Sequence, residues 1–294
     1  MNTERTKSEK TIQEIIEFGI INIDKPSGPT SFDVSDFVRK SLGLRKTSHF
    51  GTLDPKVTGV LPIALNRACK LTGYFIGHNK EYVGIMRVHG EVPIEKIRKV
   101  IKEKFIGVIK QTPPVKSRVA RREREREIKN FDILEQDGKD FLFFSNVQGG
   151  TYIRKLIDDL GKELGAGAHM LELRRVNAGI FSEDDEKYPS VNLYDFEKAV
   201  ASYKQGNENL LREIIILAEE AIKKIYPVVE VKEDNLRQIF TGKPVYSKDL
   251  VKKEKFGKEE IISVFCRDRF VGMYKITDGK DIFAKSEFVM QEIR

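Results

Sequence analysis

Residues 131–147, FDILEQDGKDFLFFSNV, constrain the fold more strongly than any other stretch of this chain. Two runs of alternating apolar and polar residues flank Asp137-Gly138, a dipeptide typical of tight hairpin turns. The stretch therefore predicts two adjacent antiparallel strands. Directly after it, residues 151–165 show the spacing of an amphipathic helix, with Thr151 as its expected N-cap. The residues expected to face the core from this helix are Ile153, Leu156, Ile157, Leu160 and Leu164.

The rest of the chain alternates between strand-like and helix-like patterns. The predicted strands include residues 19–26 and 80–92, and the predicted helices cover 32–42, 94–107 and 191–224. Thr30 or Ser31 is the expected cap of the first helix. From about residue 226 the pattern changes to short strands and turns, with EEIISVFCRDRFVGMYKIT as the best hairpin candidate. This change predicts a small β-rich C-terminal domain.

Charge and cysteine content indicate which partners and cofactors this protein can be expected to bind. Lys and Arg total 52 of the 294 residues against 45 Asp and Glu, a net charge of +7. This excess favours a polyanionic partner, because Lys and Arg contacts to phosphates release counterions. Cys69, Cys266 and the four histidines show neither disulfide nor metal-ligand spacing, so no cofactor is expected. Residues 1–17 are expected to form a polar arm, or alternatively a short helix, without a signal sequence. No run could span a membrane, and a soluble cytoplasmic protein is expected.

A basic segment runs through residues 110–129. Its cations are Lys110, Lys116, Arg118, Arg121, Arg122, Arg124, Arg126 and Lys129. The alternating REREREIK is typical of a solvated strand or helix with salt bridges. KSRVARR has fewer acids to balance it and suits contacts to phosphates. Both interpretations remain open.

TSHFGTLDPKVTG (47–59) holds the candidate site. Gly, Asp and Pro together are typical of a surface turn, and this interpretation competes with a functional role for Asp54. Arg154 is either a surface residue or an inward-pointing guanidinium that needs a carboxylate partner. Asp54 is a candidate for that partner, and a guanidinium would keep it ionised near neutral pH. His49 and Tyr82 remain open between packing or hydrogen-bonding roles and functional ones.

Six stretches of the sequence form an ordered set of motifs. They are GIINIDKPSGPTS, HFGTLDPKVTGVLPIAL, KEYVGIMRVHG, QTPPVKSRV, GGTYIRKLIDDLG and GAHMLELRRVNAG. In this order they resemble the pseudouridine synthases related to bacterial tRNA uridine-55 synthase. The resemblance is greatest to the archaeal and eukaryotic dyskerin branch, the guide-RNA-dependent synthases of box H/ACA particles. Six ordered motifs are far more specific than any single one.

This resemblance implies a fold and a domain organisation. It implies an α+β pseudouridine synthase fold with a mixed, mostly antiparallel sheet over residues 18–225, after the N-terminal arm. A PUA-type RNA-binding domain is implied over residues 226–294. The active site is expected in a basic cleft.

The resemblance also implies an activity, the isomerisation of uridine to pseudouridine in RNA. Asp54 matches the catalytic aspartate, Arg154 the arginine that pairs with it, and Tyr82 the aromatic residue that stacks on the target base. His49 matches a histidine that holds the flipped nucleotide, and flipping is required because the C1′–N1 bond is inaccessible in a stacked duplex. Lys25 matches a motif that buttresses the catalytic loop, and Leu173 lies in the segment that lines the pocket floor. For these last two a structural role remains an alternative.

Three functions remain open on these grounds. The leading one is the catalytic subunit of an archaeal-type H/ACA particle, which modifies ribosomal RNA. It works with a guide RNA and small partner proteins, and uridine-55 of tRNA is an additional target. The second is a stand-alone tRNA uridine-55 synthase. The third is a catalytically weak RNA-binding assembly subunit, suggested by the looser C-terminal match and by Phe50, which replaces a usual Ser or Thr. Phe50 either packs beneath the loop or narrows the site. Arg118, Asn177 and Ile180 also depart from the family pattern.

Overall fold

The computed structural model describes residues 7–113, 122–252, 255–279 and 281–290. The chain divides into two compact units. Glu17–Ile215 form the larger unit, and the described residues before and after this span form the smaller one. Lys116, Arg118 and Arg121 of the basic segment lie outside the described residues, so a phosphate-binding role for KSRVARR stays a prediction.

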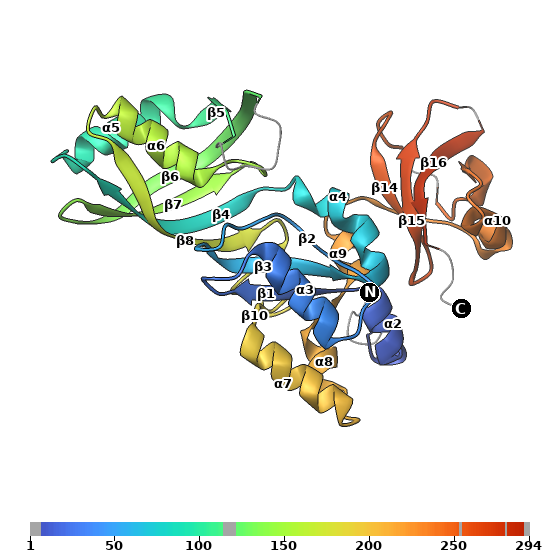
Figure 1. Cartoon of the computed structure of the whole chain (residues 1–294). Helices are drawn as coiled ribbons and strands as arrows, with labels where there is room; N and C mark the ends of the chain where they lie inside the picture. Colours follow the sequence, from blue (N-terminus) through green and yellow to red (C-terminus); the bar gives the residue numbers. More distant parts are fainter. Residues whose placement is uncertain (1–6, 114–121, 253–254, 280, 291–294) are drawn as a thin grey trace. The chain divides into compact units, whose positions relative to one another are not determined.

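A mixed sheet organises the larger unit (Figure 1). The strands follow the order β10-β1-β3-β8-β4-β7-β6-β5, with β2 paired to β3 and β9 to β8. Their bounds are β1 Gly19–Lys25, β2 Thr47–His49, β3 Thr58–Leu65, β4 Lys80–Val88, β5 Gly107–Gln111, β6 Arg124–Asp137, β7 Asp140–Val147, β8 Ala168–Ala178, β9 Phe181–Ser182 and β10 Val191–Asn192. β10 runs parallel to β1, and β8 runs parallel to β3. The pairs β8–β4, β4–β7, β7–β6 and β6–β5 are antiparallel. The expected α+β fold with a mixed, mostly antiparallel sheet is thus confirmed.

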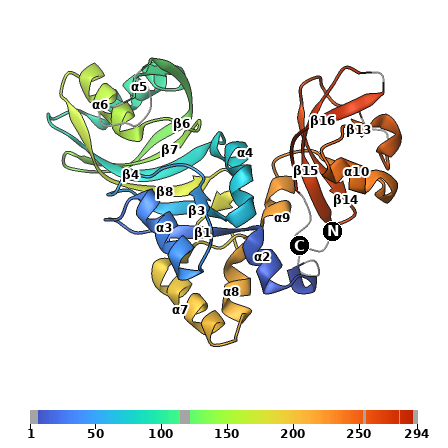
Figure 2. The same ribbon diagram turned by 45° about the vertical axis from the view of Figure 1, so that its right-hand side comes forward.

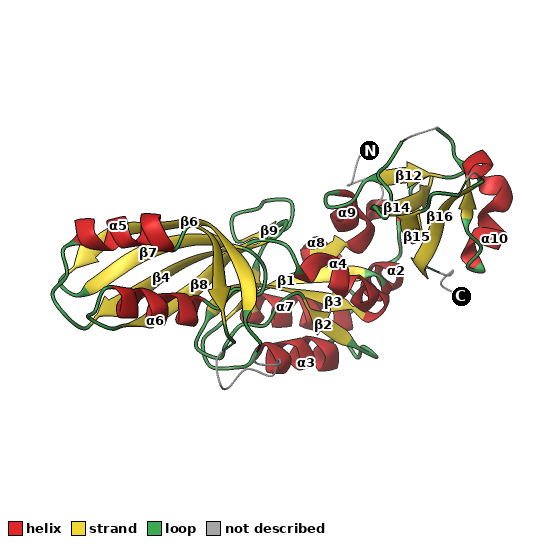
Figure 3. Cartoon of the chain, turned by 90° about the horizontal axis from the view of Figure 1, so that it is seen from above, coloured by secondary structure: helices red, strands yellow, loops and turns green. Residues whose placement is uncertain are grey.

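Helices pack on this sheet near both of its ends. Their bounds are α3 Ser31–Ser41, α4 Thr72–Ile76, α5 Ile94–Lys104, α6 Ile153–Glu163, α7 Leu193–Lys204 and α8 Asn209–Ile214, with the 3-10 helix η1 at Asn66–Leu71. Figure 3 shows α5 beside β6 and α6 beside β8, whereas α3 lies by β2 and β3. Figure 2 shows α7 and α8 together on the β1 side of the sheet. The β3–β8–β4 strands therefore lie in the middle, between the two groups of helices.

β1 and α3 place the first motif. β1 is buried along nearly its whole length, as its apolar run predicts, and Ile20, Ile21 and Ile23 are fully covered. α3 begins after Thr30, whose side chain accepts from Asp33 N, while the Asp33 side chain accepts from Thr30 N. This reciprocal capping box satisfies two backbone donors that a helix start leaves unpaired. Of the two predicted caps, Thr30 and Ser31, Thr30 is the one that the structure shows.

The predicted hairpin is present as β6 and β7, but its turn lies one residue further along. Asp137 pairs with Asp140, so Gly138 and Lys139 form the two-residue loop. Gly138 has a φ of +56°, a left-handed conformation that glycine adopts without steric penalty.

Helix α6 also starts later than predicted. Its N-cap position is Tyr152, which makes no side-chain capping bond. The Thr151 hydroxyl instead donates to Gln148 O at 2.8 Å, within a turn that precedes the helix. Thr151 as the N-cap was therefore wrong, whereas the predicted inward face is buried throughout.

Residues 191–224 are less continuous than the predicted helical stretch. Val191–Asn192 form β10, and β11 (Ile215–Leu217) separates α8 from α9 (Ala218–Lys223). Consecutive isoleucines at 214–216 explain this interruption, since β-branched side chains lose rotamer freedom in a helix and favour extended backbone.

The smaller unit holds a second sheet, in the order β12-β14-β15-β16-β13, with α10 beside it (Figure 2). The bounds are β12 Val228–Glu230, η2 Glu233–Asn235, α10 Leu236–Phe240, β13 Val245–Tyr246, η3 Ser247–Asp249, β14 Ile261–Cys266, β15 Arg269–Ile276 and β16 Ile282–Val289. β14 and β15 confirm the predicted C-terminal hairpin. The N-terminal segment contains the short helix that was the alternative to a polar arm: α2 (Ile12–Glu17), which buries Ile12, Ile15 and Ile16.

Residues 7–113, 122–252, 255–279 and 281–290 contain neither a helix that could cross a membrane nor a cluster of metal ligands. Within these ranges, no helix has the length and apolar composition needed to cross a membrane. Nor do three or more His, Cys, Asp or Glu side chains of the described chain gather as a metal ion would require. His89 Nε2 and His169 Nδ1 lie 2.7 Å apart, a pair that sequence spacing did not predict.

Candidate active site

Asp54 lies in the loop between β2 and β3, and the backbone is held on both sides of it. Before it, Leu53 N donates to Ser31 Oγ at 2.7 Å, and Ser31 Oγ donates to Leu53 O at 3.0 Å. After it, Gly28 N donates to Pro55 O at 2.9 Å. The expected turn is therefore present, and the start of α3 fixes the backbone that carries the carboxylate.

Lys25, the last residue of β1, holds the same loop from the protein interior. Its side chain is fully buried, and its ammonium donates to Pro26 O at 2.7 Å, Pro55 O at 3.0 Å and Val57 O at 2.9 Å. Burial lowers the pKa of Lys25, while the charge of Asp54 acts in the opposite direction. An ammonium has three N–H donors, and all three have acceptors here. This geometry favours the structural alternative for Lys25.

Asp54 and Arg154 form an ion pair at the start of α6. Arg154 Nη2 lies 2.7 Å from Asp54 Oδ2, and the two side chains are 49% and 47% exposed. Of the two interpretations of Arg154, the one with a carboxylate partner is correct, although both groups remain half accessible to solvent. An accessible, oriented carboxylate can act as a nucleophile or as a base toward a bound ligand.

Tyr82 and Leu173 lie on one face of the sheet. Tyr82 on β4 is opposite Arg175 on β8, and Gly84 is opposite Leu173. Residues two apart on a strand share a face, so these side chains are neighbours. Tyr82 and Leu173 are each 7% exposed. A Cβ at Gly84 would lie 2.8 Å from Leu173 Cδ1, so the glycine leaves the space that this leucine fills.

Arg175, to which the sequence analysis gave no role, joins this face to the Asp54 loop. Its side chain is 1% exposed. Nε donates to Val60 O at 2.8 Å, and Nη2 donates to Gly51 O at 3.1 Å. The sequence contained a signal for Arg175. It lies two residues after Leu173 in the same strand, so its side chain points to the same face as that leucine.

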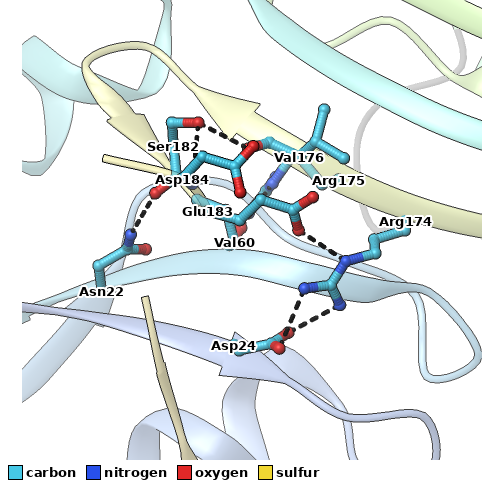
Figure 4. A network of polar contacts seen from close by, with 9 residues as sticks. All are labelled: Asn22, Asp24, Val60, Arg174, Arg175, Val176, Ser182, Glu183 and Asp184. Atoms are coloured by element: carbon cyan, nitrogen blue, oxygen red, sulfur yellow. Dashed lines mark hydrogen bonds and ion pairs between the residues drawn. The ribbon is translucent and has the colours of Figure 1, made fainter. Parts of the chain in front are cut away.

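The neighbouring Arg174 points to the other face of β8. Its Nη1 and Nη2 bind the Asp24 carboxylate at 2.9 and 3.0 Å, and Nε donates to Glu183 at 2.7 Å (Figure 4). These carboxylates raise the pKa of Arg174. The two adjacent arginines therefore differ in surroundings, since Arg174 is ion-paired and Arg175 is bonded to neutral oxygens.

Gly51 and His49 complete the approach to Asp54. Gly51 has a φ of +116°, a backbone conformation that residues with a side chain rarely adopt, so this position of the loop requires glycine. Burial lowers the pKa of His49, and the Arg175 cation lowers it further, so the imidazole is neutral at pH 7. Within the described residues, His49 Nδ1 is buried without a hydrogen-bond partner, an uncommon state for a polar atom.

Phe50 belongs to the core beneath the loop. It is 2% exposed and stacks on Phe75, with ring centroids 4.6 Å apart and an interplanar angle of 2°. Its centroid also lies 5.9 Å from that of Phe181. Of the two interpretations of Phe50, packing beneath the loop is the one that the structure supports.

Two family models match the chain. The model of the N-terminal domain of TruB family pseudouridylate synthases matches residues 39–95, which include Asp54 and Tyr82. The model of the C-terminal domain of tRNA pseudouridylate synthase B matches residues 154–223, which include Arg154 and Leu173. The two matches together include Asp54, Tyr82, Arg154 and Leu173, whereas Lys25 and Ser31 lie before the first of them.

Relatives are similar over most of the chain. Proteins of Methanopyrus kandleri and Methanocaldococcus jannaschii, both named probable tRNA pseudouridine synthase B, are each 45% identical to it. The matches cover 84% and 87% of this chain and 72% and 75% of those proteins. Among solved structures, a chain of a Cbf5–Nop10–Gar1 complex aligns with a TM-score of 0.87 at 37% identity. A chain of an H/ACA particle bound to a substrate RNA containing 2′-deoxyuridine aligns with a TM-score of 0.86 at 35% identity. Both structural matches cover 97% of this chain and 89% of the other.

Proposed function

The chain belongs to the TruB family of pseudouridylate synthases, and we propose that it isomerises uridine in ribosomal RNA as the catalytic subunit of an H/ACA-type particle. Uridine-55 of tRNA is a further proposed target. The observation that carries the proposal is the similarity over 97% of the chain to proteins solved in a Cbf5–Nop10–Gar1 complex and in an RNA-bound H/ACA particle. The proposed partners are accordingly a guide RNA and small particle proteins.

In the proposed reaction, Asp54 acts on a uridine that has been flipped out of its helix. The carboxylate attacks C1′ as a nucleophile, or it removes the 2′ proton to give a glycal and later returns it. In both routes the C1′–N1 bond breaks, the base turns, and a C1′–C5 bond forms while the C5 proton is lost and N1 gains one. The half-exposed position of Asp54 supports this role, and Arg154 holds the carboxylate in place.

The other site residues have proposed roles around the base. Tyr82 stacks on the uracil and helps to move a proton, Leu173 lines the pocket floor, and His49 holds the flipped nucleotide. The shared face of β4 and β8 supports the first two assignments. Lys25 supports the catalytic loop through three backbone carbonyls rather than by touching the substrate.

For residues 226–294 we propose a PUA-type RNA-binding domain. Its sheet has its own apolar core, which includes Val264, Val271 and Tyr274, and this supports a separate binding module. It would hold the end of a guide RNA.

A stand-alone tRNA uridine-55 synthase is the second candidate, favoured by the names of the Methanopyrus kandleri and Methanocaldococcus jannaschii relatives. The third candidate, an assembly subunit with weak activity, loses one of its two supports because Phe50 packs in the core. Its other support is the looser C-terminal sequence match.

The test is tritium release from C5 of labelled uridine. Purified protein receives a tRNA, or a ribosomal RNA fragment with and without a matching guide RNA and the small particle proteins. We expect release from the guided fragment and about a 10²–10⁴-fold loss in Asp54→Asn. Release from tRNA but never from a guided fragment would select the stand-alone enzyme. RNA binding without any release would select the assembly subunit, and full activity of Asp54→Asn would reject the catalytic assignment.

A further inference from the structure

Strand β6 separates its charges between two faces. Residues two apart on a strand share a face, so the alternating sequence places Arg124 and Arg126 on one side and Glu125 and Glu127 on the other. The two arginines share their side with Ile128, which is fully buried, whereas the two glutamates are exposed. Over residues 124–128, one face of β6 therefore carries only positive charge.

Strand β5 and helix α6 show which side of β6 the arginines occupy. Gln111 on β5 is opposite Arg124, and directly opposite residues of an antiparallel pair share a face. Gln111 is buried and bound to the residue before α6: its Nε2 donates to Tyr152 O at 3.3 Å, and its Oε1 accepts from Tyr152 N at 3.1 Å. The positive face of β6 is therefore on the side of α6, whose Arg154 pairs with Asp54.

Arg126 reaches the backbone that leads into α6. A Cβ placed on Gly150 would lie 3.2 Å from Arg126 Nη2, so the guanidinium lies against this part of the chain. Arg126 Nη1 donates to Glu125 O at 2.7 Å, and the guanidinium has further N–H donors for a ligand. Among the described residues, no carboxylate lies within ion-pair distance of Arg126. The residues that line a shallow depression of the surface here are Gln111, Pro113, Arg124, Arg126, Gly150 and Tyr152.

We propose that Arg124 and Arg126 bind neighbouring phosphates of the RNA strand that carries the target uridine, and hold that strand at the start of α6. The inference rests on the proposed function, since it names a contact through which the same site takes its substrate. Residues two apart on a strand are about 6.6 Å apart, so the two guanidinium groups can take separate phosphates. A guanidinium can donate two parallel N–H bonds to one phosphate, whereas the carboxylates on the outer face of β6 would repel it.

The experiment measures RNA affinity and its dependence on salt. The Kd of the chain for a short labelled oligouridine is determined at several salt concentrations for the wild type, Arg124→Gln, Arg126→Gln and the double variant. Each single substitution should raise the Kd by about 10-fold, the loss expected for one hydrogen bond to a charged group. Each should also make the plot of log Kd against log salt less steep by about 0.7, because one phosphate contact fewer releases counterions.

Lys110→Gln is the matched control, because it removes one positive charge from the outer face of the same two strands. Lys110 is opposite Glu125, and its Nζ lies 3.6 Å from a Glu123 carboxylate oxygen. We expect this control to change the Kd by less than about 2-fold and to keep the wild-type salt dependence.

Two further variants separate loss of the cation from loss of local packing. Arg124→Lys and Arg126→Lys keep the positive charge, so both should keep the wild-type salt dependence. Thermal melting identifies any variant that fails to fold. The two Gln substitutions are read independently, so one that fails to fold leaves the other as the test.

Steady-state tritium release in the complete RNA–protein system gives a second measurement. A contact that is equally strong in the bound substrate and in the transition state affects KM alone, so KM should rise while kcat changes by less than about 2-fold. Folded Gln variants with the Kd and salt dependence of Lys110→Gln would overturn the proposal, because the arginines would then form only a solvated face. A lower kcat at unchanged KM and Kd would overturn it as well, and would make Arg126 a support of α6. A wild-type chain that binds oligouridine but releases no tritium from any RNA would reject the proposed function instead, so the two failures are distinguishable.

Discussion

The two sides of the Asp54 loop use charge in opposite ways. On the solvent side, Asp54 and Arg154 are oppositely charged, paired and about half exposed. On the inner side, Lys25 and Arg175 are buried and donate to neutral carbonyl oxygens. An exposed ion pair contributes little to stability, because water screens it. A buried cation that satisfies several carbonyls leaves those carbonyls unpaired when it is removed.

The solvent-side residues are therefore expected to serve the reaction, and the buried cations are expected to hold the loop in place. Changes on the inner side should appear first in the free energy of unfolding, and changes on the solvent side should appear in the rate. Four predictions test this division, in order of their expected effect on stability.

Phe50→Ser should be the most destabilising of the four changes. It empties the space stacked on Phe75 and buries a hydroxyl, so we expect a loss of about 4 kcal/mol in the free energy of unfolding. Urea denaturation measures the loss, and Phe50→Leu should lose clearly less. If Phe50→Ser kept its stability and changed only KM for RNA, Phe50 would belong to the substrate side of the loop.

Lys25→Met should lower the free energy of unfolding by about 3 kcal/mol. Pro26 O and Val57 O would each lose a buried donor, whereas Pro55 O keeps the bond from Gly28 N. Activity should fall as well, since the loop that carries Asp54 is released. The control is Lys56→Met in the same loop, where the lysine is exposed. Equal losses in the two variants would contradict a specific role for Lys25.

Lys80 should make stability depend on pH. Its pKa of about 8 lies below the ordinary 10.5, so between these values the folded chain loses a proton that the unfolded chain keeps. Stability from this group therefore rises with pH, by about 1.4 kcal/mol between pH 7 and pH 9.

The measurement is the difference in urea-denaturation free energy between the wild type and Lys80→Met across this range. Burial raises the pKa of Cys69 to about 11, so above pH 9 this thiol lowers stability as the pH rises. The difference between the two proteins cancels this contribution of Cys69. Parallel pH profiles for the two proteins would mean that Lys80 keeps an ordinary pKa in the folded chain.

Arg154→Ala should change stability least and activity strongly. The ion pair is half exposed, so we expect a loss of at most about 1 kcal/mol, while tritium release falls by about 10²-fold because Asp54 loses its orienting partner. Lys162→Ala, which breaks the exposed pair with Asp158 on the same helix, should lose as little stability and keep its rate. A fully active Arg154→Ala would remove the ion pair from the mechanism.

Local patterns in the sequence predicted much of the fold. The apolar run of β1, the alternation in β6 and β7, and the Thr30–Asp33 capping box each depend on a few neighbouring residues. Thr151 was misassigned because a competing local turn takes its hydroxyl. The break at β11 was missed because the helical spacing of apolar residues over 191–224 was followed, whereas the three consecutive isoleucines within it favour extended backbone.

The site itself depended on contacts between distant residues. Turn chemistry and the family resemblance located Asp54, but its pairing with Arg154 joins positions 100 residues apart and stayed open until the structure placed them together. Arg175 was missed for the same reason. Its hydrogen-bond partners, Val60 O on β3 and Gly51 O in the Asp54 loop, lie more than 100 residues before it in the sequence.

The composition of the smaller unit has a consequence for synthesis. Helix α2 clusters with the residues from 216 onward, and Lys10 is paired with Glu219. A ribosome adds roughly 5–20 residues per second, so about 10–40 s separate the appearance of α2 from that of residue 216. During that interval the N-terminal segment lacks the later residues of its own unit, and Lys10 lacks its partner Glu219. The smaller unit therefore cannot be completed until the larger unit, which lies between its two segments in the sequence, has been synthesised.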